Sequence, residues 1–180
     1  MKPIRVISLW EPWASLAVHG IKKIETRPKP TSWTADKGIY LVHAAKRWTR
    51  TQKELCRKDV FYDLLEGIRH AETFIEEETG KLVRIPFFQS TFGHIIGSFE
   101  VRECCELYLH HNKVEYANLE KGYQTWHEVR EPELSFGDYR EGRYAWILQN
   151  PRVLKTPIPY KGQQGYYGKF DGDVNKLEFV

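Results

Sequence analysis

The sequence has 180 residues, of which 41% are hydrophobic, 28% charged and 14% aromatic, a composition typical of globular proteins. It has no apolar run near the roughly 20 residues of a transmembrane helix, and its first apolar run is too short for a signal peptide. The three cysteines do not make a disulfide framework, so we expect a reducing, cytoplasmic setting. These features predict one domain over residues 1–180 and a monomer, with no membrane contact and no cofactor.

Charge is distributed unevenly along the chain. Residues 1–60 hold 13 Lys and Arg against 5 Asp and Glu, residues 61–141 hold 8 against 16, and residues 142–180 hold 6 against 3. If the two basic ends meet in the fold, they form a basic face that attracts polyanions such as nucleic acids. The alternative is that this segregation makes only a solvated surface without a binding role.

The first thirty residues predict a strand, a helix and a second strand. Apolar residues alternate over 4–9, as in a strand. Pro12 suits the first turn of a helix over 13–19, and Gly20 suits its end because glycine tolerates the left-handed cap conformation. The second strand is expected over 21–27, and it carries four charged side chains: Lys22, Lys23, Glu25 and Arg27.

The remaining sequence predicts further strands over 39–45, 93–109 and 143–149, which are rich in β-branched or aromatic residues. A helix capped by Thr49 or Thr51 is expected to continue to about Glu78. An apolar stripe at helical spacing follows, and it comprises Tyr116, Leu119, Tyr123, Trp126 and Val129. Short strands separated by turns favour a small closed β-barrel over a doubly wound sheet.

The spacing of Gly20, Lys22, Glu25 and Arg27 resembles the GxKxxExR signature of the activating signal cointegrator homology (ASCH) domain family. The preceding SLWEPWASLAVHG and the later residues 93–106 and 142–168 are also similar to that family, in the same order. The likeness is closest to the C-terminal domain of the transcription coactivator from which the family takes its name. The resemblance implies an α+β fold, a PUA-like mixed β-barrel with flanking helices, with a helical insertion around residues 49–80.

The candidate nucleic-acid site combines cations, a carboxylate and aromatic rings. Arginine and lysine suit phosphate, and Glu25 suits the amino group of a base. Trp10 is expected to line a pocket and Trp13 to pack in the core. The predicted binding residues are Trp10, Lys22, Glu25, Arg27, Lys46, Arg47, Arg50, Gln163, Tyr166 and Tyr167. The alternative is an exposed strand with Lys–Glu–Arg ion pairs of little energetic consequence.

These residues favour a module that binds RNA or DNA and holds one base at the barrel mouth. The resemblance also implies a hydrolase as the alternative, because some small ASCH proteins are amidohydrolases of acetylated cytidine and others are described as ribonucleases. Lys22 and Glu25 are then the catalytic candidates, and Glu100 is a candidate for a second carboxylate. Glu25 stands where those amidohydrolases have a threonine nucleophile, so we favour binding. A protein-interaction domain is the third alternative.

No metal site is expected. Cys104, Cys105, His110 and His111 lie close together but lack the spacing of zinc ligands. Neighbouring residues of a strand point to opposite faces, so the two cysteines are expected on different sides of the sheet.

Overall fold

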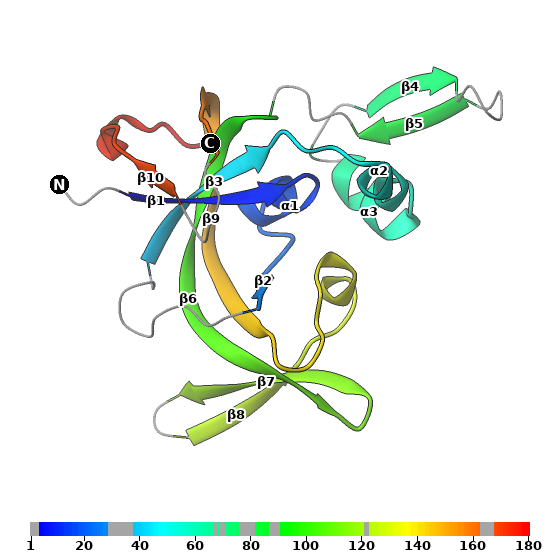
Figure 1. Cartoon of the computed structure of the whole chain (residues 1–180), viewed down its shortest axis with the longest axis vertical. Coiled ribbons are helices and arrows are strands. Elements are labelled where there is room, and N and C mark those ends of the chain that lie inside the picture. The colour runs from blue at the N-terminus through cyan, green and yellow to red at the C-terminus, as the bar shows by residue number, and fades with distance from the viewer. Residues whose placement is uncertain are drawn as a thin grey trace.

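The computed structural model describes residues 4–28, 38–66, 68, 71–75, 82–86, 91–120, 123–162 and 168–180. The fold is α+β (Figure 1). In chain order its elements are β1 (Ile4–Trp10), α1 (Trp13–Val18), β2 (Ile24–Arg27), β3 (Gly38–Ala45), α2 (Arg50–Cys56), α3 (Asp59–Glu66), β4 (Ala71–Ile75), β5 (Leu82–Pro86), β6 (His94–His110), β7 (Lys113–Glu120), β8 (Tyr123–Glu128), the 3-10 turn η1 (Glu133–Phe136), β9 (Tyr144–Pro159), β10 (Gly168–Phe170) and η2 (Val174–Lys176).

The long, bent strands β6 and β9 form the centre of the main sheet (Figure 1). On one side of β6 the order continues through β3 and β1 to β10, and β1 runs parallel to β3. On the other side β9 pairs with β2, while the far end of β6 pairs with the β7–β8 hairpin. Strands β4 and β5 form a separate two-stranded sheet.

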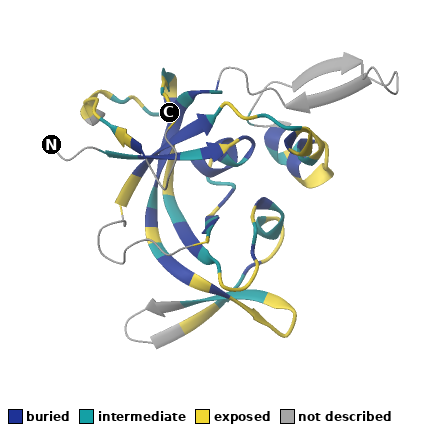
Figure 2. Cartoon of the chain, viewed as in Figure 1, coloured by how far each residue is buried: buried dark blue, intermediate teal, exposed yellow. Residues whose placement is uncertain are grey.

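We expected a closed barrel, but the strand pairings of the described residues leave the main sheet open. Helix α1 fills its concave side, where Ala14, Ala17 and Val18 pack among buried residues such as Ile7 and Trp146 (Figure 2). Among the described residues, the strands on either side of α1 are therefore joined through packing on this helix, and not by hydrogen bonds between edge strands.

The predicted strand–helix opening is confirmed, although β2 starts later than expected. Gly20 has φ +73°, the left-handed conformation that ends the helix. The backbone N–H groups of Ile21 and Lys22 both donate to the carbonyl of Leu16, at 2.9 and 3.0 Å. The chain is therefore still turning at Lys22, and strand pairing begins only at Ile24.

Two predicted helical segments are wrong. Helix α3 ends at Glu66, and residues 71–75 pair with 82–86 as an antiparallel hairpin. The apolar stripe belongs to the β7–β8 hairpin, in which Tyr116 lies opposite His127 and Ala117 opposite Trp126. Tyr116 packs on a buried cluster, whereas Trp126 is 50% exposed, so the stripe does not form one face.

Candidate functional site

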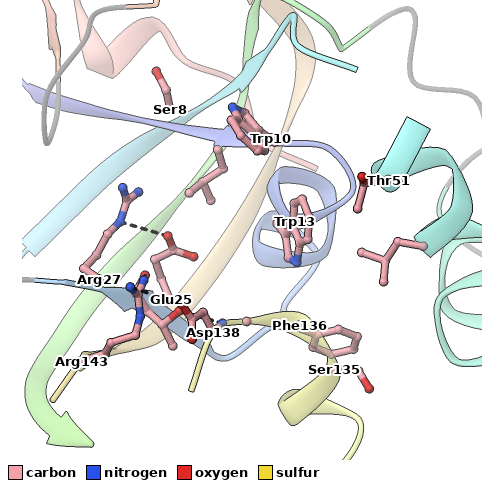
Figure 3. A pocket seen from close by; sticks show the side chains of 14 residues that line it. Ser8, Trp10, Trp13, Glu25, Arg27, Thr51, Ser135, Phe136, Asp138 and Arg143 are labelled. Carbon is pink, nitrogen blue, oxygen red and sulfur yellow. Dashed lines mark hydrogen bonds and ion pairs between the residues drawn. The ribbon is translucent and has the colours of Figure 1, made fainter. Parts of the chain in front are cut away.

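A cleft of about 710 Å³ opens between the end of β1, helix α1, strand β2 and the turn η1 (Figure 3). We call it the Glu25 cleft. Trp10 and Trp13 contribute aromatic walls, and residues 25–27 of β2 contribute charged ones. Segment 135–138 and Arg143 complete the opposite side, with Ser8, Leu9, Thr51 and Leu55 at the margins.

Glu25 is a fixed carboxylate in the wall of this cleft. Its Oε1 lies 3.0 Å from Nε of Arg27, and its Oε2 lies 3.6 Å from Nζ of Lys22. The Glu25 side chain is 12% exposed, so two cations orient it while it still faces the cleft (Figure 3). Arg27 also lines the cleft and lies over the ring of Trp146, with 5.8 Å from Cζ to the ring centroid.

Lys22 lies behind the cleft and is not part of its wall. Its side chain is 1% exposed, and Nζ donates to the carbonyls of Ile24 and Phe136, the second at 3.0 Å. Burial lowers the pKa of the Lys22 ammonium, and the negative charges of Glu25 and Glu133 oppose this shift. Lys22 therefore joins β2 to the turn η1 beneath Glu25.

Glu133, which the sequence analysis missed, also holds β2 in place. Its carboxylate accepts from the backbone N–H groups of Lys23 at 2.8 Å and Ile24 at 3.1 Å. The hydroxyl of Tyr139 donates to the same carboxylate at 2.8 Å. The acidic middle of the chain thus contributes directly to the site, through contacts more than one hundred residues apart that have no local signal in the sequence.

Asp138 and Arg143 add a second pair of opposite charges to the cleft. Their closest charged atoms, Nη1 of Arg143 and Oδ2 of Asp138, lie 3.4 Å apart. Arg143 also donates to the carbonyl of Thr26 at 3.3 Å, which ties this pair to β2. With Glu25 and Arg27 the cleft therefore has two carboxylates and two guanidinium groups among its described residues, a balanced set suited to an uncharged polar group.

A second cleft of about 810 Å³ lies on the other side of Ser8 and Trp10, which line both. We call it the Lys46 cleft. Its remaining walls come from His43 near the end of β3, from Lys46 just after that strand, from Gly93, and from residues 159–162. Ser8 Oγ lies 2.9 Å from Nδ1 of His43 because the two residues are register partners on β1 and β3.

Trp10 lines both clefts. Its side chain is 43% exposed, and Cζ of Arg47 lies 4.7 Å from its ring centroid. Lys46 lines the second cleft. Arg50, in contrast, lines neither cleft and pairs with Glu54, with Nε 2.8 Å from Oε1.

The remaining predicted residues either lie outside the described part of the chain or do not line the two clefts. Gln163, Tyr166 and Tyr167 lie outside the described residues, although the neighbouring Tyr160, Lys161 and Gly162 line the Lys46 cleft. Glu100, the candidate second carboxylate of a hydrolase, lines neither cleft and accepts from Gln149 at 3.2 Å and Asn150 at 3.0 Å.

Among the residues that the structure describes, no group of three or more His, Cys, Asp or Glu side chains is placed to hold a metal ion. Cys104 and Cys105 pack in different buried clusters, as expected for neighbours on a strand. None of the described helices has the length and apolar character needed to span a bilayer.

The sequence model of the ASCH domain family matches residues 7–158. This range begins within β1 and ends within β9, and it includes every described residue that lines the Glu25 cleft, whereas residues 159–162 of the Lys46 cleft lie beyond it. The chain therefore belongs to the ASCH domain family, within the PUA-like superfamily. A search of curated protein sequences gives no match to it.

Proposed function

We propose that this ASCH domain binds RNA or DNA and holds one base in the Glu25 cleft. The observation that carries the proposal is the position of Glu25, a carboxylate oriented by Arg27 and Lys22 in a cleft that two tryptophans also line. An oriented carboxylate accepts hydrogen bonds from the amino group of cytosine, adenine or guanine, and it disfavours phosphate at the same place.

The exposed Trp10 ring supports this proposal from the other side of the cleft. A base that stacks on an exposed aromatic ring gains about 1–3 kcal/mol, and the gain depends little on which base it is. Arg47, stacked on the same ring, adds a positive charge close to where the sugar–phosphate backbone would leave the cleft. Stacking thus supplies affinity, and Glu25 supplies the preference among bases.

A fluorescence anisotropy titration tests the proposal. Labelled single-stranded RNA, single-stranded DNA and duplex DNA are titrated with the protein at two salt concentrations. We expect binding of at least one of them, with affinity falling by about 0.7–0.9 log units per log unit of salt for each phosphate neutralised. Absence of binding to all three at low salt would contradict the proposal.

A separate turnover assay distinguishes binding from hydrolysis. Incubation with acetylated cytidine or with RNA, followed by chromatography, is expected to leave both intact. Steady turnover that disappears in Glu25→Gln would instead identify a hydrolase, because the carboxylate would then act as a general base.

A further inference from the structure

We propose that the Lys46 cleft is a phosphate subsite, which takes the phosphate attached to the nucleoside whose base occupies the Glu25 cleft. This inference rests on the proposed function, because it assigns to one ligand the two clefts that share Ser8 and Trp10. The ligand chemistry is that of a phosphorylated nucleoside, either a free nucleotide or one unit of a strand.

The two clefts differ in charge, as a site for a base and a site for a phosphate would. The Glu25 cleft contains the carboxylates Glu25 and Asp138. The Lys46 cleft contains Lys46 and Lys161, and no Asp or Glu occurs among the described residues that line it. Neither of these lysines pairs with a carboxylate in the described part of the chain, so an anion from outside would meet two uncompensated cations there.

A buried imidazole nitrogen provides an independent reason to expect a ligand. His43 is only 4% exposed and forms part of the cleft wall, yet its Nε2 has no hydrogen-bond partner among the described residues. Buried polar atoms are normally satisfied, because an unsatisfied one costs about 1–3 kcal/mol. A ligand that contacts Nε2 would remove this cost.

The hydrogen bond between Ser8 and Nδ1 of His43 leaves Nε2 as the ring nitrogen without a partner among the described residues. If the Ser8 hydroxyl donates to Nδ1 of His43, the single hydrogen of the neutral ring is on Nε2, which then donates. Burial, together with the nearby His94 and Lys46, lowers the pKa of His43, which keeps the ring neutral. With this tautomer, the cleft combines an N–H donor of His43 with two lysines in its wall, a set that suits an acceptor-rich group such as phosphate.

Neighbouring residues pack closely against the His43 ring. A Cβ atom at position 162 would lie 2.5 Å from Cε1 of His43 and 3.0 Å from its Nδ1, so glycine lets the chain approach this ring closely. Tyr160 meets the His43 ring edge to face, with 5.3 Å between centroids. The imidazole is therefore held in one orientation at the cleft.

The first test uses inorganic phosphate as the probe, so that it does not depend on any base. Phosphate is titrated into protein with ¹⁵N-labelled histidine, and the Nε2 resonance of His43 is followed by NMR. We expect a saturable shift in the wild type, and binding about tenfold weaker in Lys46→Gln and in Lys161→Gln. Lys53→Gln, an exposed lysine of α2 outside both clefts, serves as the matched control and should bind as the wild type does.

The second test compares a nucleoside, its 5′- and 3′-monophosphates, and a dinucleotide by calorimetry. We expect at least one monophosphate or the dinucleotide to bind about tenfold more tightly than the nucleoside, and Lys46→Gln to abolish this difference. A dinucleotide that exceeds both monophosphates identifies a strand as the source of the phosphate, and equal affinities identify a free nucleotide.

The results separate this inference from the proposed function. Phosphate that leaves His43 Nε2 unperturbed, or that binds equally well to the wild type and to both lysine variants, would overturn the subsite. If inorganic phosphate binds as expected but no nucleoside binds, the anion subsite stands, and the proposal of a base in the Glu25 cleft fails.

Discussion

Lys22 and Glu25 meet with 3.6 Å between Nζ and Oε2, but only Glu25 faces the cleft. Both residues belong to the family signature GxKxxExR. Their spacing in this signature does not indicate which of the two faces the cleft. Because the chain is still turning at Lys22, its side chain points beneath β2, and Glu25 lies on the strand itself. The lysine therefore positions the carboxylate, and the carboxylate is the group available to a ligand.

Replacement of Lys22 by methionine is expected to destabilise the protein strongly. The change leaves the carbonyls of Ile24 and Phe136 and one oxygen of Glu25 without the ammonium group they now share. Loss of one partner from a buried ion pair typically costs about 3–5 kcal/mol of the free energy of unfolding. Urea denaturation measures this loss in the free energy of unfolding. Lys23→Met is the control, because Lys23 is an exposed neighbour, and we expect its free energy of unfolding to change by no more than about 0.5 kcal/mol. Equal stabilities of the two variants would contradict the positioning role.

Trp10→Ala is expected to weaken nucleic-acid binding without a comparable loss of stability. The ring is 43% exposed and lines both clefts, so its removal deletes a stacking surface worth about 1–3 kcal/mol of binding free energy. Trp126→Ala provides the control, because that ring is 50% exposed on the β7–β8 hairpin and lines neither cleft. The two variants are compared by anisotropy, and a similar loss of affinity in both would speak against a role specific to Trp10.

His43 is expected to make the protein less stable in mildly acidic solution. Burial, followed by the charges of His94 and Lys46, lowers the pKa of His43 from its ordinary value of 6.5. Below that pH the unfolded state takes up a proton that the folded state resists, so the free energy of unfolding falls as the pH decreases below about 6.5. Above about pH 7 both states are neutral at this residue, and its contribution is constant.

Urea denaturation over a series of pH values checks this dependence. We expect His43→Gln to have a shallower slope than the wild type between about pH 5 and 6.5, whatever its stability at neutral pH. Identical slopes in the two proteins would show that His43 takes up its proton with equal ease in the folded and unfolded states.

The sequence predicts the elements of this fold best where the pattern is local. Alternating apolar residues predict β1, and the proline and glycine at the two ends of α1 predict that helix. The strand predicted over residues 93–109 is almost the observed β6. Local spacing fails for the β7–β8 hairpin, because the positions of Tyr116 and Trp126 are set by pairing across strands, which places them on opposite faces.

The site was predicted only in part, for a similar reason. The signature and its flanking tryptophans predict Trp10, Glu25 and Arg27 as site residues, and all three line the Glu25 cleft. The pair Ser8 and His43 depends on the register of β1 with β3, which no local pattern indicates. Glu133 and Asp138 each form a hydrogen bond with residues at or next to β2, and these contacts exist only in the folded chain. In the sequence, both residues are simply part of an acidic segment.

The measurement that tests the central claim most directly is the base preference of Glu25→Gln. Single-stranded oligonucleotides that differ at one central position, in an otherwise uniform sequence, are compared for the wild type, Glu25→Gln and the exposed control Glu141→Gln, with circular dichroism to confirm folding. We predict that the wild type and Glu141→Gln favour a base with an exocyclic amino group over uracil or thymine by about fivefold or more, and that Glu25→Gln loses this preference while its salt dependence is unchanged. An unchanged order and ratio of affinities in Glu25→Gln would contradict the placement of a base against this carboxylate.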